Sequence, residues 1–120
     1  SPVQGSRLNQ WLAPRAQNGY GFDEPTQNFV DEFEMTADSV YDPRLDYTLG
    51  RNGSLWFDDV PYDTSWSSTG YNQKKTLQPA SEIPASTKGD ADLNFTVIRY
   101  AEVLLIKAEA LCEMGNCAEA

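Results

Sequence analysis

The amino-acid sequence predicts a mainly helical fold in which one long amphipathic helix follows a loop-rich region. Three observations predict it. Apolar side chains recur at helical spacing throughout residues 96–114. Residues 26–36 combine a capping threonine with the same apolar period. Elsewhere Pro, Gly, Ser and Asp interrupt every periodic run, which is typical of loops.

The first helix is expected at residues 26–36, after a loop at residues 1–24. Glycine and proline punctuate this loop and leave no periodic run in it. Thr26 can cap the helix because its hydroxyl can accept a hydrogen bond from an otherwise unpaired backbone N–H. Three apolar residues then share one helical face: Phe29, Val30 and Phe33.

A short β-hairpin is expected within residues 45–57. Residues 45–49 alternate apolar and polar side chains like a half-buried strand. Asn52-Gly53 is a hairpin turn signal, and residues 55–57 can pair back after it. Residues 58–92 have no sustained period, so we expect a long irregular loop there, of a length that is usually functional or disordered.

The helix at residues 96–114 is the clearest element. Thr96 is the expected N-cap and Gly115 the expected left-handed C-cap. Residues 117–120 resemble the start of a second helix, so that this end of the chain is similar to half of a tetratricopeptide hairpin. Because a half-repeat cannot bury its own apolar stripe, the chain is expected to be an internal fragment of a larger protein.

Composition excludes several classes of function. The chain has 18 acidic and 9 basic residues, no His and a net charge of −9. It therefore lacks the basic surface of a nucleic-acid-binding protein and the imidazole used in most metal and acid–base sites. The longest aliphatic run, residues 103–106, is too short to span a membrane, and a targeting segment is expected upstream. Cys112 and Cys117 are expected to be two free thiols or one local disulfide.

Aromatic and aliphatic residues are unevenly spread. Residues 1–92 hold 11 of the Val, Ile and Leu residues but 12 of the 14 aromatic ones, whereas residues 93–120 hold 8 Val, Ile and Leu. A core for the first part must therefore be built largely from rings, which few aliphatic neighbours can cover. Much of this surface is therefore expected either to pack against something absent from the chain or to be partly exposed for binding, because planar rings bind the apolar faces of sugars.

Three segments, in this order, resemble the C-terminal region of the SusD/RagB family. The first is residues 25–34, where Pro-Thr-Gln precedes Phe-Val-Asp and Phe-Glu. The second is Asp42-Pro43-Arg44-Leu45. The third is residues 97–115, where Arg-Tyr-Ala-Glu leads into a long amphipathic helix and a glycine stop. The loops at residues 1–24 and 58–92 match only loosely.

The resemblance implies a tetratricopeptide-based helical fold with a loop-rich C-terminal region. It also implies a lipid-anchored protein on the outer-membrane surface of a Bacteroidetes-type bacterium. Such a protein captures an oligosaccharide or polysaccharide and delivers it to a SusC-like TonB-dependent transporter. It is not an enzyme, no cofactor or metal is expected, and the lipid anchor outside these residues is its contact with the membrane.

Two loops carry the residue types that glycan binding needs, namely rings beside amide, guanidinium or carboxylate groups. The first set, favoured because the family draws binding aromatics from loops before the Pro-Thr-Gln helix, is Asn9, Trp11 and Arg15. The second set is Tyr62, Trp66 and Tyr71. For both sets the alternative is that the rings only pack against the rest of the fold.

Three other functions are open at this point. The long helix can belong to a protein-interaction scaffold that binds no glycan. The acidic residues Asp58, Asp59 and Asp63 can be read as the paired carboxylates of a glycoside hydrolase or as oxygen ligands of Ca²⁺. Their spacing matches no EF-hand, and a solvated acidic surface is the favoured explanation of these residues.

Overall fold

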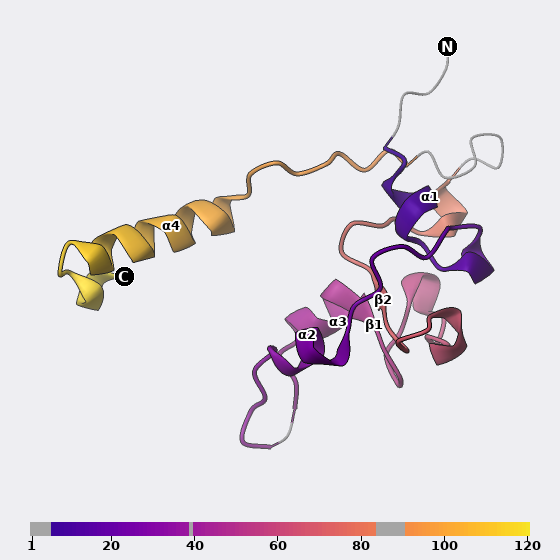
Figure 1. Cartoon of the computed structure of the whole chain (residues 1–120), viewed down its shortest axis with the longest axis horizontal. Coiled ribbons are helices and arrows are strands. Elements are labelled where there is room, and N and C mark those ends of the chain that lie inside the picture. Colours follow the sequence, from indigo (N-terminus) through magenta and orange to yellow (C-terminus); the bar gives the residue numbers. More distant parts are fainter. Residues whose placement is uncertain (1–5, 39, 84–90) are drawn as a thin grey trace, which may run out of the picture.

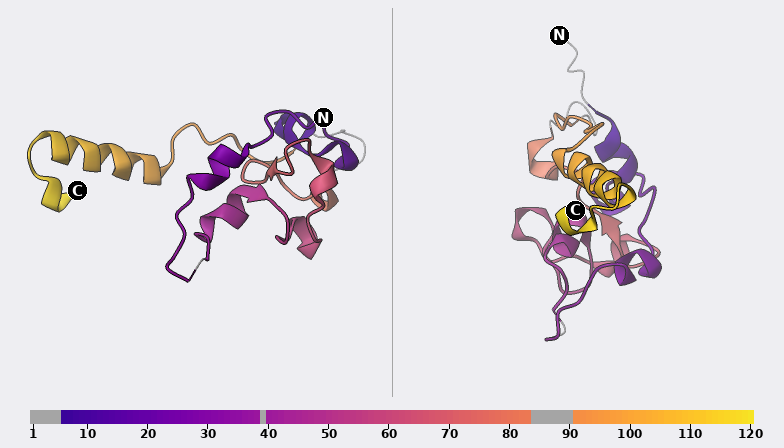
Figure 2. Two further views of the ribbon diagram at one scale, coloured as in Figure 1. Left: turned by 60° about the horizontal axis from the view of Figure 1, so that its bottom comes forward. Right: turned by 90° about the vertical axis from the view of Figure 1, so that its left-hand side faces the viewer.

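The computed structural model describes residues 6–38, 40–83 and 91–120. A loop-rich body carries the short helices and the sheet, and one longer helix extends from it as an arm (Figures 1 and 2). The helices and strands are α1 (Leu8–Leu12), α2 (Gln27–Asp31), α3 (Arg44–Thr48), β1 (Leu49–Gly50), β2 (Asn72–Gln73) and α4 (Tyr100–Glu113). Single 3₁₀ turns lie at Arg15–Gln17, Phe57–Asp59, Thr64–Trp66, Ala80–Glu82 and Cys117–Glu119. The predicted mainly helical fold with a short antiparallel pair of strands is confirmed.

Helix α1 corrects the expectation that residues 1–24 are loop throughout. Leu12 is buried in the core, and Leu8, one helical turn earlier, packs against the same core. The helix stops because Ala13 precedes Pro14 and adopts the extended backbone that such a position favours. Five residues are too few to produce a periodic signal in the sequence, which is why the pattern missed this helix.

Helix α2 begins where the sequence predicted and ends five residues early. Thr26 has the extended backbone of an N-cap, although its side chain makes no capping hydrogen bond. The expected continuation to residue 36 is wrong, because the chain turns back on itself instead. The amide of Asp42 donates to the carbonyl of Glu34 at 3.0 Å, and that of Thr36 donates to Val40 at 2.9 Å.

The expected hairpin within residues 45–57 is also wrong in its position. Residues 44–48 form α3, whose N-cap is Pro43, and the side chain of Asp42 accepts a hydrogen bond from the Arg44 amide at 2.8 Å. Strands β1 and β2 form an antiparallel pair in which Leu49 lies opposite Gln73. A Cβ at Gly50 would lie 2.4 Å from the ring of Tyr62, so the glycine lets core rings pack directly against β1.

The described residues of the body form two small hydrophobic cores. The first consists of Leu12, Ala13, Trp56, Tyr62 and Leu77, with Leu8, Phe57 and Trp66 packed against it. The second consists of Val30, Leu45 and Leu49, with Phe33, Tyr41 and Tyr71 packed against it. Rings supply much of both cores, as the scarcity of aliphatic residues before residue 93 predicted.

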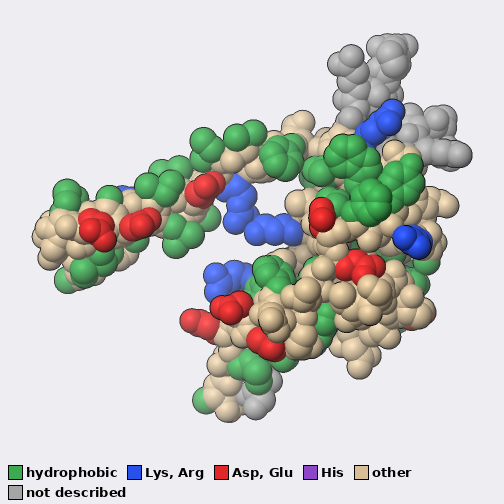
Figure 3. Space-filling view, in the orientation of Figure 1, with side chains coloured by type: hydrophobic (Ala, Val, Ile, Leu, Met, Phe, Trp, Pro, Cys, Tyr) green, Lys and Arg blue, Asp and Glu red, His purple; other side chains and the backbone are tan. Residues whose placement is uncertain are grey.

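Helix α4 forms the arm and ends as predicted. Its N-cap is Arg99 rather than the expected Thr96, so the helix starts about one turn late. At the other end Gly115 has a φ of +83°, and the amides of Gly115 and Asn116 donate to the carbonyls of Cys112 and Leu111. This pair of bonds is a Schellman motif. No residue of α4 is buried, and its apolar side chains are visible along the arm in Figure 3.

Replacing Gly115 with alanine is expected to destabilise the end of α4 by about 1 kcal/mol, because a side chain disfavours the left-handed backbone of this residue. Circular dichroism at 222 nm during thermal unfolding measures the effect. Gly115→Asn is the matched control, because asparagine tolerates this conformation and should lose less. Equal losses in both variants would contradict the backbone explanation.

Candidate functional site

Three exposed rings of the body lie where the chain after α1 returns alongside that helix. The amide of Tyr20 donates to the carbonyl of Gln10 at 2.8 Å, and that of Phe22 donates to Trp11 at 2.9 Å. Trp11, Tyr20 and Phe22 are 48%, 46% and 53% exposed, respectively. The centroids of Tyr20 and Phe22 are 5.5 Å apart. We call Trp11, Tyr20 and Phe22 the ring platform.

A tight turn holds the ring platform in place. The amides of Gly19 and Gly21 donate to the carbonyls of Pro14 and Ala13 at 3.1 and 3.0 Å. A Cβ at Gly19 would lie 2.0 Å from the Ala13 carbonyl oxygen, so only glycine fits there. Arg15 also stabilises the turn, because its Nε donates a hydrogen bond to the Tyr20 carbonyl at 3.2 Å. The platform is therefore pre-organised by backbone contacts.

A groove of about 690 Å³ adjoins the platform. Its lining residues are Arg15, Ala16, Gly21, Glu24, Ser65, Trp66, Ser67 and Ser68. Arg15 belongs to both surfaces, since it also lines a shallow hollow beside Tyr20 and Phe22. The groove thus combines a half-buried indole with guanidinium, carboxylate and hydroxyl groups, which are the donors and acceptors that read sugar hydroxyls.

Glu24 is held in this groove as an ionised acceptor. The backbone amide and the hydroxyl of Ser68 donate to its Oε2 at 3.1 and 2.5 Å. Partial burial raises the pKa of Glu24, but the hydrogen bonds from Ser68 and its neighbours outweigh that effect and hold the pKa below its usual value. Glu24 is therefore suited to accept hydrogen bonds rather than to donate a proton at neutral pH.

The structure brings together two of the six residues singled out in the sequence, because Arg15 and Trp66 line the same groove. Trp66 is fixed by edge-on contacts with Tyr62 at 5.4 Å and Trp56 at 6.2 Å between ring centroids. Trp11 is exposed outside the lining of this groove, where its carbonyl accepts the amide of Phe22. The turn around Arg15 and the loop around Trp66 therefore contribute to one groove.

The other three have structural partners. The amide of Asn9 is buried and pairs with both backbone groups of Gln78, at 2.9 and 3.0 Å. Tyr62 is buried, its hydroxyl donates to Asn72 Oδ1 at 2.7 Å, and burial raises its pKa. The hydroxyl of Tyr71 donates to Gln27 Oε1 at 2.5 Å while its ring packs on the second core. For these residues the packing alternative fits the contacts.

Sequence reasoning missed Tyr20, Phe22 and Glu24. The signal that could have found them is the glycine-rich turn at residues 18–21, because a tight turn between two apolar segments presents the side chains that flank it. Their distance from Trp11 along the chain hid the fact that residues 20–22 run back beside α1.

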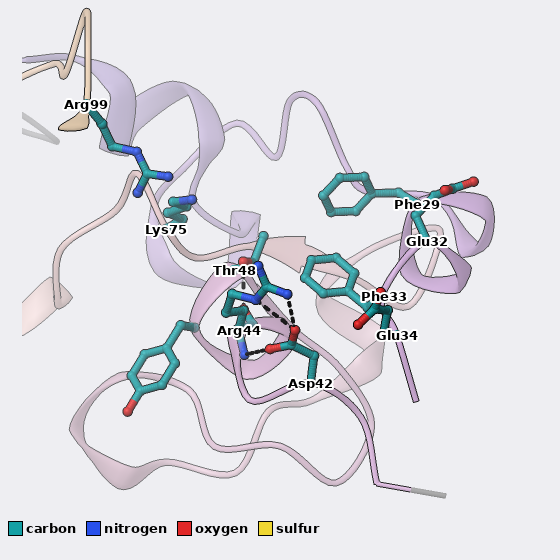
Figure 4. A pocket seen from close by; sticks show the side chains of 10 residues that line it. Phe29, Glu32, Phe33, Glu34, Asp42, Arg44, Thr48, Lys75 and Arg99 are labelled. Carbon is teal, nitrogen blue, oxygen red and sulfur yellow. Dashed lines mark hydrogen bonds and ion pairs between the residues drawn. The ribbon is translucent and has the colours of Figure 1, made fainter. Parts of the chain in front are cut away.

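A second groove, of about 710 Å³, lies on the face of the body toward the arm (Figure 4). It is lined by Phe29, Glu32, Phe33, Glu34, Asp42, Arg44, Tyr47, Thr48, Lys75 and Arg99. We call it the arm groove. Within it Arg44 forms an ion pair with Asp42, and hydrogen bonds from Arg44 lower the pKa of that carboxyl. The sequence analysis did not single out this face.

Replacing Gly19 with alanine is expected to destabilise the body by about 1–3 kcal/mol, because the new Cβ overlaps a backbone carbonyl that cannot rotate away. The turn that carries Tyr20 and Phe22 should shift with it. Urea unfolding measures the free energy. Gly70→Ala is the control, since a Cβ there meets no atom within 4 Å, and its positive φ, which Gly19 does not share, should cost only about 1 kcal/mol. An equal loss in both variants would contradict overlap as the main cause.

Comparison with known proteins identifies the family of the chain. Among the described residues, no helix has the length and hydrophobicity to cross a bilayer, and no group of three or more Cys, Asp and Glu side chains is placed to hold a metal ion. No curated protein and no solved structure matches the chain significantly. The sequence model of the SusD family matches residues 2–120. Because this match covers nearly the whole chain, and the segments that resemble the family lie within it, the chain belongs to the SusD family.

Proposed function

We propose that this chain binds an oligosaccharide on the ring platform and in the groove beside it, and that its parent protein passes the ligand to a SusC-like TonB-dependent transporter. Proteins of the SusD family are in general glycan-binding proteins of nutrient uptake rather than enzymes, and they are typically outer-membrane lipoproteins. The single observation that carries the proposal for this chain is that two segments joined by backbone hydrogen bonds expose three rings, two of which lie beside Arg15.

The binding mechanism follows from the side chains present. The platform rings stack on the apolar C–H faces of successive sugar units, while Arg15 and the Ser68 hydroxyl lie within the adjoining groove to bind sugar hydroxyls. Glu24 accepts hydrogen bonds there, since it is held ionised. Because the platform is fixed by backbone hydrogen bonds, little conformational entropy is lost when the ligand binds.

The test is calorimetric titration of the chain with a panel of neutral oligosaccharides, compared with a variant in which Trp11, Tyr20 and Phe22 are all alanine. We expect binding of at least one glycan by the native chain and none by the variant, with unchanged circular dichroism. Binding that survives the triple substitution would remove the platform from the site. New reducing ends after incubation would instead indicate a hydrolase, with the carboxylates discussed above as candidates.

A second candidate function has one observation in its favour. The apolar side chains of α4 are exposed along the whole helix, as on a helix that works by packing against protein. In that case the chain belongs to an interaction scaffold whose platform rings bind nothing. Binding of a partner barrel protein by the full-length protein, together with the absence of glycan binding, would favour it.

A further inference from the structure

The arm groove gathers positive charge in a strongly acidic chain. Only 9 of the 120 residues are Lys or Arg, against 18 acidic ones. Three of the nine, Arg44, Lys75 and Arg99, nevertheless line this single groove although they lie far apart in the sequence. In the space-filling view, basic side chains meet in the hollow between the arm and the body (Figure 3). The fold, and not the local sequence, creates this cluster.

Two of the three cations are available to a ligand. Arg44 is neutralised by Asp42, which accepts hydrogen bonds from its backbone amide and its guanidinium. Lys75 and Arg99 form no ion pair with any carboxylate among the described residues. Both also line a second, adjoining pocket of about 340 Å³, which we call the cationic corner. Figure 4 shows both side chains at the end of the groove opposite Glu32 and Glu34.

The corner also carries groups that suit a sugar. Thr76, Asn94 and Thr96 line the pocket around the two cations and can bind hydroxyls. Rings that are exposed to solvent line the adjoining spaces: Phe29 and Tyr47 line the arm groove, and Phe95 lines the smaller pocket. Cations, hydroxyl-binding groups and rings together fit a sugar ring that bears one negative charge.

The carboxylates around the groove favour a ligand that carries a single negative charge. Glu102 lines the cationic corner, and Glu32 and Glu34 lie at the far end of the groove. Two cations would attract a dianion such as a phosphate monoester, but these carboxylates and the net charge of −9 would repel it. A carboxylate is a monoanion whose two oxygens match the planar fork of a guanidinium. The far carboxylates then accept hydrogen bonds from neutral sugar hydroxyls and set the direction of the ligand.

We infer that the arm groove binds the carboxylate of an acidic sugar, a uronic acid, between Lys75 and Arg99. The inference rests on the proposed glycan-binding function and extends it to a second subsite and a ligand class. The neutral part of the same glycan lies along the rings of Phe29 and Tyr47, and the arm supplies one of the two cations.

The test compares an otherwise neutral oligosaccharide that carries one uronic acid unit with the methyl ester of the same oligosaccharide, which has the same sugar rings but no charge. Calorimetric titration should show the acid binding about five- to tenfold more tightly, as two solvent-exposed ion pairs would give. Lys75→Gln and Arg99→Gln should each reduce this preference, and the double variant should abolish it without weakening the ester. Lys107→Gln is the matched control, because it removes the same charge from an exposed position on α4 outside the groove.

Each outcome decides the inference. Equal affinity for the acid and the ester overturns it while leaving the proposed function intact. An equal loss in the Lys107→Gln control overturns it too, because the effect is then one of overall charge. Preference for a sulfated oligosaccharide over the carboxylated one overturns the uronic acid assignment. If neither form binds, the inference fails, whereas the proposed function is decided by the panel of neutral oligosaccharides. If only the acid binds, and the double variant loses it, the inference holds.

Discussion

Replacing Trp11 with alanine is expected to weaken glycan binding about thirtyfold, which corresponds to about 2 kcal/mol for the loss of a central aromatic contact. The fold should survive, because about half of this side chain is exposed and its ring pairs with no other ring among the described residues. Calorimetric titration of the native and variant chains with the same glycan measures the change.

The control is Tyr100→Ala, which removes an exposed ring from the first turn of α4, far along the chain from the platform. It should leave the affinity unchanged. Comparable losses in the two variants would mean that ligand binding depends on exposed apolar surface in general. An unchanged affinity in Trp11→Ala would remove Trp11 from the site and leave the groove around Trp66 as the remaining candidate.

Replacing Trp56 with alanine is expected to destabilise the body by about 3–5 kcal/mol. The indole is buried at the centre of the first core, with ring centroids of Phe57 and Tyr62 at 5.0 and 5.6 Å. Its Nε1 also donates to Gln17 Oε1 at 2.8 Å, and the substitution leaves that acceptor without its partner. Because small domains are stable by only about 5–15 kcal/mol, the loss approaches the whole stability of the body.

Urea unfolding followed by far-ultraviolet circular dichroism measures this effect without relying on tryptophan fluorescence. Leu55→Ala is the matched control, since Leu55 precedes Trp56 but is 52% exposed. It should change the free energy of unfolding by no more than about 0.5 kcal/mol. A loss in Trp56→Ala no larger than this would show that the ring cluster does not hold the body together.

Helix α3 shows why part of the fold could not be predicted. Leu45 and Leu49 are compatible with either element, because residues four apart share a face both in a helix and in a strand. Tyr47 distinguishes the two: a strand places it on the same face as both leucines, whereas a helix places it on the opposite one. In the structure both leucines are fully buried and Tyr47 is 78% exposed. Packing in the second core therefore selects a helix rather than a strand at residues 44–48, a choice that the local sequence pattern could not predict.

The site was predicted in part for a similar reason. Composition and motif identified loops rich in rings, and Arg15 and Trp66 do line one groove, while Trp11 is exposed outside its lining. Which rings face solvent depends on contacts between distant segments. Trp11 is exposed and Trp56 is buried, although the residue type is the same.

The sequence by itself determined the features that local chemistry controls. Helix α4 follows from its apolar period, and its end follows from the left-handed backbone that Gly115 accepts without a steric penalty. Only the tertiary structure decided that Asn9 pairs with Gln78, that residues 20–22 lie beside α1, and that Lys75 meets Arg99. The physical reason is that burial and charge clustering depend on long-range contacts, whereas capping and helical period depend on neighbours within one turn.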